Sequence, residues 1–136
     1  MPKIKKISHV AMVVEDIEDS LTFWRDALGI ELTGFKDVPS EGAKVALLHI
    51  GESELELVQP VDRDRGLFRY LEKRGPGLHH VCLEVDDIEG MLGGLQEKGI
   101  QLINDVPQVE PGGKKYAFIH PKSTQGVLVE LYEIRR

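Results

Sequence analysis

The chain has 136 residues, of which 41% are hydrophobic and 29% are charged, proportions that are ordinary for one globular domain. A net charge of −6 and a pI near 5.4 argue against binding nucleic acid or anionic membrane through overall charge. The single cysteine, Cys82, excludes an intrachain disulfide framework, and its apolar surroundings indicate a packed thiol in a reducing compartment. No apolar run is long enough for a signal peptide or a membrane span, so we expect a soluble cytoplasmic protein.

The first half of the chain predicts one helix and four strands. Residues 3–14 alternate and are rich in β-branched side chains, which is typical of a strand. Apolar residues then repeat at helical spacing between Asp16, an expected N-cap, and Gly29, an expected C-cap. Turn residues separate three further predicted strands, which cover 30–35, 44–50 and 54–59.

The second half repeats this order after a charge-rich segment that has no counterpart. In that segment, Leu67, Tyr70 and Leu71 have helical spacing, which predicts a short linker helix. A helix is then expected over 88–98, with strands over 78–85, 101–104, 114–119 and 127–133. We therefore expect a single domain over residues 1–136, made of two repeats (about 4–60 and 77–134) that a linker helix (about 61–76) joins.

Residue matches between the two halves support a duplication. A shift of 71 positions places segment 7–18 on 78–89 and matches His9 with His80. With three further residues, Glu56 falls on Glu130. Two halves that match at a nearly fixed offset indicate a duplicated unit.

The matched histidines and glutamates predict a four-ligand metal site. Imidazole nitrogen and carboxylate oxygen are common ligands of divalent cations, and a carboxylate within an apolar strand needs a partner. Taken alone, such a histidine is more often a core residue and such a glutamate more often faces solvent. Their duplication favours the site formed by His9, Glu56, His80 and Glu130.

The other histidines do not share this pattern. His79 points to the opposite face of its predicted strand from His80, because side chains alternate along a strand. His49 and His120 also repeat, but they lie at strand ends next to turns, where we expect structural roles.

Two β-α-β-β-β units with this histidine and glutamate pattern resemble the vicinal oxygen chelate (glyoxalase/bleomycin resistance/dioxygenase) superfamily over nearly the whole chain. The resemblance implies an α+β fold whose paired modules form an open, eight-stranded, barrel-like sheet around one metal. Two motifs are similar to those of methylmalonyl-CoA epimerases: Gly-Leu-His-His-Val at 77–81 followed by Val-Asp-Asp-Ile at 85–88, and His-Pro-Lys-Ser at 120–123 followed by Gly-Val-Leu-Val-Glu-Leu at 126–131.

The resemblance implies an isomerase that interconverts (2R)- and (2S)-methylmalonyl-CoA by α-proton abstraction and a metal-stabilised enolate. The implied metal ligands are His9, Glu56, His80 and Glu130. Cobalt is the expected ion, with manganese, nickel or zinc as alternatives. Family members are commonly dimers, so we expect a homodimer whose partner is a small acyl-CoA substrate.

One departure leaves the catalytic base open. Some epimerases carry a glutamine at the Glu56 position and a separate glutamate base at a position that is Val45 here. The base that transfers the α proton would therefore be Glu56, Glu130 or metal-bound water. Lys114, Lys115 and Lys122 are equally compatible with contacts to CoA phosphates and with an ordinary solvated surface.

Other members of the superfamily provide alternative functions. A glyoxalase I-like lactoylglutathione lyase, which isomerises the methylglyoxal-glutathione hemithioacetal, would use the same four ligands. The turn His120-Pro121-Lys122 disfavours it, because those enzymes usually carry an Asp-Pro-Asp-Gly type turn there. Antibiotic-sequestering modules generally lack the full ligand set, and extradiol dioxygenases are usually longer chains.

Overall fold

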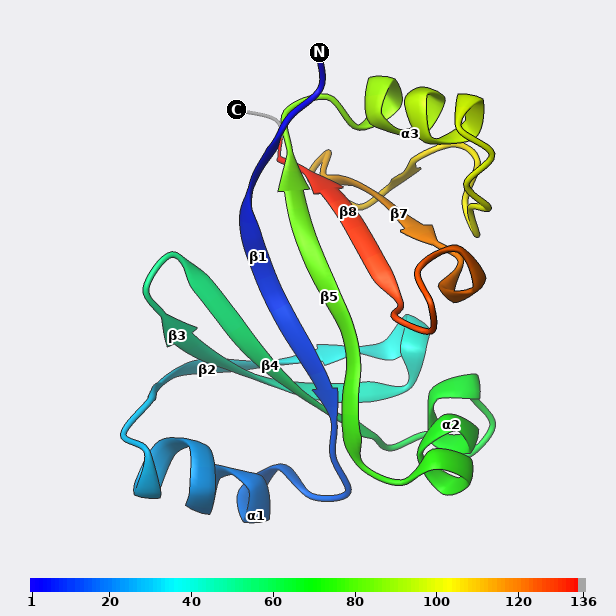
Figure 1. The fold of residues 1–136 in the computed structure, drawn as a ribbon. Coiled ribbons are helices and arrows are strands. Elements are labelled where there is room, and N and C mark those ends of the chain that lie inside the picture. The colour runs from blue at the N-terminus through cyan, green and yellow to red at the C-terminus, as the bar shows by residue number, and fades with distance from the viewer. Residues whose placement is uncertain (135–136) are drawn as a thin grey trace. The chain divides into compact units, whose positions relative to one another are not determined.

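The protein is described here by a computed structural model, which covers residues 1–134 (Figure 1). The chain forms two compact units. Unit 2 is the continuous segment Val10–His79, whereas unit 1 combines Met1–His9 with the residues from His80 onward. Strands β1 (Ile4–Val13) and β5 (Gly77–Val85) therefore contribute residues to both units.

Unit 2 packs a helix on each face of its strands. Its elements after β1 are α1 (Ile17–Leu21), η1 (Thr22–Ala27), β2 (Glu31–Val38), η2 (Pro39–Glu41), β3 (Ala43–Ile50), β4 (Ser53–Pro60) and α2 (Gly66–Arg74). Strands β2, β3 and β4 form an antiparallel series, with β1 next to β4. Leu21 of α1 is buried against Leu48 and Leu57, while Leu67 of α2 packs against a second core cluster that includes Val45.

Unit 1 carries its helix on the strands that follow β5. Its further elements are α3 (Ile88–Glu97), β6 (Gln108–Val109), β7 (Lys115–Ile119), η3 (Pro121–Ser123) and β8 (Val129–Glu133). Strand β8 lies parallel to β5 and antiparallel to β7, and β6 is the edge strand beyond β7. Ile88 and Leu92 of α3 are buried with Leu131 of β8.

The expected fold class is confirmed. Eight strands and three α-helices are present among residues 1–134, and each half of the chain begins β-α. Edge strand β2 of unit 2 and edge strand β6 of unit 1 each have one neighbour, so neither unit closes its strands into a barrel. A helix, α2, lies in the linker segment, while the division into two sequence repeats stays a prediction. None of the described helices has both the length and the apolar character needed to cross a membrane.

The predicted strand at residues 101–104 is wrong. This segment makes only a single bridge to β7, between Leu102 and Ile119. The Asn104 side chain replaces the next ladder contact by accepting a hydrogen bond from Phe118 N at 2.8 Å. Pro107, which has no backbone N–H to donate, separates this bridge from the two-residue strand β6. The first half of the chain thus has one long strand, β2, where the second half has a single bridge and a two-residue strand.

The helix predicted up to Gly29 is present but changes its geometry. After α1 the chain widens into a π-helix, in which Leu28 N donates to Phe23 O at 2.9 Å. Trp24 still packs on the core beside Leu21, but Phe23 and Leu28 are 51% and 55% exposed. Strand β2 also extends to Val38, into the predicted loop.

Candidate metal centre

Cross-strand contacts in unit 1 place the two duplicated histidines side by side. Lys5 Nζ of β1 lies 3.2 Å from Glu84 Oε2 of β5. Four residues along each strand, His9 Nε2 lies 3.3 Å from His80 Nε2. The contacts advance along β1 as they retreat along β5, as in an antiparallel pair (Figure 1). Because residues two apart share a strand face, all four side chains lie on the same face.

Strand β8 adds a carboxylate to the two imidazoles. Its register places Glu130 opposite Cys82 of β5 and Phe118 of β7. Glu130 Oε1 lies 3.0 Å from His80 Nε2 and 3.4 Å from His9 Nε2. The Glu130 side chain is 10% exposed and each imidazole 12%. Three donor atoms from three strands therefore meet in a nearly buried group.

The imidazoles keep the Glu130 carboxyl ionised. Burial alone would raise its pKa. Hydrogen bonds to His80 and His9 and the positive charge of these rings lower the pKa by more than burial raises it, so that the pKa falls to about 2. A buried carboxylate is costly unless it is paired. Here the two rings provide the pairing that the strand position requires.

Neighbouring side chains fix the orientation of both imidazoles. Ser8 Oγ lies 3.3 Å from His9 Nδ1, which leaves Nε2 of that ring for the shared group. The His80 ring meets the Phe118 ring edge-on, with centroids 5.6 Å apart. Contacts of this kind around metal ligands set the tautomer and the direction of the donor atom.

The donor set fits one divalent cation. Donors bound at about 2.0–2.1 Å in a tetrahedral or octahedral site lie about 2.9–3.4 Å from one another. The three separations among His9, His80 and Glu130 are 3.0, 3.3 and 3.4 Å. Two imidazole nitrogens and one carboxylate oxygen also suit the borderline divalent metals.

Cys82 is a further donor that the sequence analysis interpreted only as a packing residue. It is fully buried, and its sulfur and one ligand atom each of His9 and Glu130 lie within 4.8 Å of one another. The available signal was its spacing of two residues from His80, which puts both on one face of a strand. A thiol at this place would favour zinc and other thiophilic ions.

Glu56, the fourth predicted ligand, belongs to unit 2. It is half-buried on β4, opposite Leu47 of β3. The placement of the two units relative to each other is not determined, so its role as a ligand stays a prediction. Val45, at the position of the base in some epimerases, is 3% exposed in an apolar cluster.

The remaining histidines have separate contacts. The His79 ring packs edge-on against Tyr70 in unit 2, with centroids 4.9 Å apart. His120 Nδ1 accepts a hydrogen bond from Lys122 N at 3.0 Å and thereby caps η3, which is a structural role. His49 is exposed on β3, opposite Glu54 of β4.

Comparisons with known proteins agree with this fold. Residues 8–118 match the family model for the Glyoxalase/Bleomycin resistance protein/Dioxygenase superfamily. The mitochondrial methylmalonyl-CoA epimerase of Mus musculus is 36% identical over 130 residues, which cover 95% of this chain and 73% of that protein. The ethylmalonyl-CoA/methylmalonyl-CoA epimerase of Cereibacter sphaeroides is 33% identical and covers 96% of this chain and 99% of its own.

A solved structure of methylmalonyl-CoA epimerase in complex with methylmalonyl-CoA and NH4+ is 28% identical, with a TM-score of 0.84 and coverage of 96% of this chain and 95% of that one. A probable lactoylglutathione lyase of Synechocystis is less similar, at 27% identity over 92% of each chain. The chain therefore belongs to the methylmalonyl-CoA epimerase family of the glyoxalase/bleomycin resistance/dioxygenase superfamily.

Proposed function

We propose that this protein is a metal-dependent epimerase that interconverts (2R)- and (2S)-methylmalonyl-CoA. The observation that carries the proposal is the buried Glu130 carboxylate, which meets His9 and His80 at separations that fit one divalent cation. The named activity of relatives at 33% and 36% identity supports the substrate class.

His9, His80 and Glu130 are the proposed holders of the cation, with Glu56 as a fourth ligand. The bound cation would supply a Lewis acid that stabilises negative charge on the thioester oxygen as the α proton leaves. Ser8 and Phe118 hold the two imidazoles in the orientation that the donors need. The low exposure of the three ligands limits water at the group, which strengthens electrostatic interactions there.

Epimerisation needs a base on one face of the planar intermediate and an acid on the other. Val45 is an apolar core residue and supplies neither group. We assign the proton transfers to Glu56 and Glu130, the matched carboxylates from the last strand of each repeat. Glu130 lies among the proposed ligands, so its part in proton transfer and its part in metal binding need separate tests.

Proton NMR with methylmalonyl-CoA in deuterated water tests the reaction. The metal-free protein and the Co²⁺-loaded protein are compared by the α-proton signal and by the ratio of stereoisomers. We expect exchange and isomer interconversion only with metal, and their loss in His80→Ala and Glu130→Ala. Glu97→Gln, an exposed change on α3, is the matched control. If no exchange above the uncatalysed rate occurred with Co²⁺, Mn²⁺, Ni²⁺ or Zn²⁺, the epimerase assignment would be wrong.

Lactoylglutathione lyase activity is the second candidate, because a glutamate at position 56 also matches the ligand set of glyoxalase I. The same metal-loaded preparation is given methylglyoxal and glutathione, and thioester formation is followed by absorbance. We expect no turnover, because the chain is less similar to the lyase than to the epimerases. Efficient thioester formation together with no epimerisation would replace the first proposal with the second.

Three finer properties belong to the proposal as well. We infer that Co²⁺ gives the highest turnover, that the enzyme is a homodimer and that it works in the cytoplasm. Activity after reconstitution with Co²⁺, Mn²⁺, Ni²⁺ and Zn²⁺ tests the first property. Light scattering of the purified protein tests the second, and fractionation of the source cells tests the third.

A further inference from the structure

A buried ion pair lies near the donor group of unit 1, on the same strand face. Among residues 1–134, Glu84 and Glu130 are the two buried charged side chains. Glu130 belongs to the donor group, whereas Glu84, which is 2% exposed, has its Oε2 atom 3.2 Å from Lys5 Nζ. The proposed metal site uses neither Lys5 nor Glu84. Because an ionised carboxylate is rarely buried without a specific reason, the pair needs an explanation of its own.

Contacts between β1 and β5 define one antiparallel register. Asp86 N donates to Lys3 O at 3.1 Å, and Lys3 N donates to Asp86 Oδ1 at 2.8 Å. Two residues further along β1 comes the ion pair, and four residues beyond it come the two imidazoles. Equal steps forward on one strand and back on the other are those of an unbroken antiparallel pair. This register places Ile7 opposite Cys82.

The alternating pattern of β1 does not by itself exclude a register that is shifted by two residues. A shift of one residue would exchange the two faces of the strand, which the buried core forbids. A shift of two residues keeps every side chain on its own face and would move His9 past His80 by about 6.8 Å. Donor atoms that share one cation lie only about 2.9–3.4 Å apart. A shift of two residues would therefore separate the two imidazoles and destroy the donor group.

The connection between β1 and β5 is too long to set this register. Segment Met1–His9 is followed by the whole of unit 2, Val10–His79, before the rest of unit 1 begins. The strands of a tight hairpin receive their register from the turn between them, but β1 and β5 have no such turn. Contacts between the two strands must therefore determine which residues of β1 and β5 lie opposite each other.

The charges on the two strands disfavour both shifted registers. If β1 moved by two residues in one direction, Ile7 would lie opposite Glu84, and the buried carboxylate would lose the cation beside it. If β1 moved in the other direction, Lys5 would lie opposite Cys82, which is fully buried, and Lys3 would lose its two hydrogen bonds. Removal of one partner from a buried ion pair is strongly destabilising, and the selection of a register is the best-attested role of buried polar groups.

We propose that Lys5 and Glu84 are a positioning pair, which fixes the register of β1 against β5 and thereby brings the His9 imidazole to the donor group. Neither side chain is a ligand in this assignment, because the pair acts through the strand that carries His9. The assignment rests on the proposed function for the metal ion that the donors hold, but it does not depend on which substrate the enzyme takes.

An apolar pair of similar volume separates the register from the stability. Lys5→Met/Glu84→Leu removes both charges, and such exchanges often leave the free energy of unfolding unchanged or raise it. We expect urea denaturation to show no loss of stability, whereas cross-strand NOEs between β1 and β5 of the metal-free protein should report more than one register. The dissociation constant for Co²⁺, measured by calorimetric titration, should rise about tenfold or more, as for residues that orient a metal ligand.

Single substitutions of Lys5 test the charge itself. Lys5→Gln removes the cation beside Glu84 and should weaken Co²⁺ binding about tenfold or more. Lys5→Arg keeps a cation of sufficient reach and should stay within about twofold of the wild type. Lys3→Gln is the matched control, because it removes an equal, exposed charge from the start of β1 and keeps the backbone contacts with Asp86. This control should change Co²⁺ binding less than about twofold.

Three results would overturn the assignment. A single, native set of NOEs together with wild-type Co²⁺ affinity in Lys5→Met/Glu84→Leu would show that the register does not need the charges. A loss of stability in that variant would make the ion pair a source of stability and not of register. Equal weakening in Lys3→Gln and Lys5→Gln would mean that Co²⁺ responds only to the overall charge of the strand.

These measurements need no substrate, so the positioning pair and the epimerase can fail separately. If Co²⁺ binding and the NOEs follow the expected pattern but the wild type does not exchange the α proton of methylmalonyl-CoA, the positioning role stands and the proposed reaction is wrong. If the wild type exchanges the proton and Lys5→Met/Glu84→Leu keeps its register and its Co²⁺ affinity, the reaction stands and the positioning role is wrong.

Discussion

The two units carry side chains of different chemical character at matched positions of their strands. On one strand face of unit 2, Ala11, Val45 and Val58 form an apolar cluster that Leu67 of α2 joins. The matching positions of unit 1 are Cys82, Tyr116 and Tyr132. In unit 1, the face with Cys82 and Glu130 carries the donor group, whereas α3 packs with Leu131.

The difference teaches that matched strand positions can carry apolar residues in one unit and polar or aromatic residues in the other. Where α2 supplies an apolar cover, small apolar residues beneath it stabilise the unit by burial, on the order of 25 cal/mol per Å² of apolar surface. In unit 1 the matching positions carry a thiol and two phenols beside the nearly buried donor group. Apart from Glu56, the polar side chains at the matched positions of this face thus lie in unit 1.

Exchanging the matched glutamates for glutamine is expected to have the largest effect. Glu130→Gln removes the buried anion from between two imidazoles. Mutation of a residue that only hydrogen-bonds to a metal ligand lowers metal affinity or activity roughly 10–100-fold, and loss of a proposed ligand itself should have a larger effect. Glu56→Gln should retain metal, because some epimerases carry glutamine there, while activity falls. Metal content after dialysis and the deuterium-exchange rate are the measurements. Equal loss of metal in both variants would show that the two glutamates are equivalent ligands.

Truncation of matched core leucines should affect the two units alike. Leu21 and Leu92 are 0% and 2% exposed, and each is on the buried face of its unit's helix. Leu21→Ala and Leu92→Ala should each lower the free energy of unfolding by about 2–5 kcal/mol, as measured by urea denaturation. Leu28→Ala, at a side chain that is 55% exposed, should cost less than about 0.5 kcal/mol. Two separate transitions, of which each variant shifts only one, would show that the units unfold independently.

Both units anchor a helix N-terminus in the same way. Ile17 N donates to Gln59 Oε1, and Ile88 N donates to Glu133 Oε1, each at 2.9 Å. Gln59→Ala and Glu133→Ala should each lower the free energy of unfolding by about 1 kcal/mol and speed hydrogen exchange at the corresponding amide. Swapping the pair, by Gln59→Glu and Glu133→Gln, keeps an acceptor in both units and should cost less. If the swapped protein lost as much free energy of unfolding as the alanine variants, the charge of the side chain, and not only its acceptor oxygen, would determine the stability of each helix start.

The smallest expected effect is the difference in stability between variants of the two helix N-caps, Asp87 and Asp16. Asp87 accepts a hydrogen bond from Gly90 N at 3.1 Å, whereas the Asp16 side chain makes no cap hydrogen bond. Asp87→Ala should therefore lower the free energy of unfolding by about 1 kcal/mol, and Asp16→Ala by less than about half of that. Thermal unfolding of both variants measures the contrast. Equal shifts would indicate that charge near the helix start, rather than the cap bond, stabilises both helices.

Much of the fold could be predicted because the matched residues of the two halves allowed the elements expected in one half to be checked against those of the other. Alternation fixed the faces of β1 correctly, since Ala11 and Met12 pack into different clusters. The strand predicted at 101–104 failed because the Asn104 side chain takes the place of a backbone contact. Sequence alternation does not reveal a hydrogen bond that depends on the course of a neighbouring strand.

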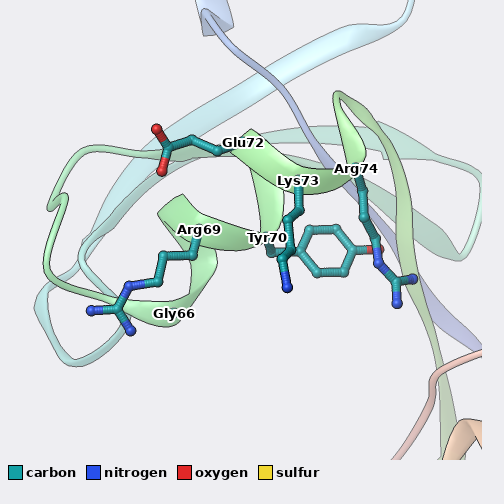
Figure 2. Close-up of a pocket in the computed structure, with 6 residues that line it drawn as sticks. All are labelled: Gly66, Arg69, Tyr70, Glu72, Lys73 and Arg74. Carbon is teal, nitrogen blue, oxygen red and sulfur yellow. The ribbon is translucent and has the colours of Figure 1, made fainter.

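The donor group could be predicted in kind but not in geometry. The offset between the repeats pairs His9 with His80, yet only the strand register shows that their Nε2 atoms lie 3.3 Å apart. The directions of the long side chains on α2 could not be predicted either: Arg69, Lys73 and Arg74 extend toward one side of the helix, and Glu72 points to the other (Figure 2). Helical spacing alone does not give the directions of such long, flexible side chains.

Strand β1 is divided between the two units, and this division has a consequence for biosynthesis. Unit 2 is one continuous segment, so a ribosome completes all of its strands and α2 while unit 1 is represented only by Met1–His9. Domains generally fold as units during synthesis, so unit 2 can reach its native contacts first. His9 must then wait for 71 residues until His80 emerges, and for β8 until Glu130 does. The nascent chain therefore cannot hold the proposed metal ion through all three donors until β8 has left the ribosome.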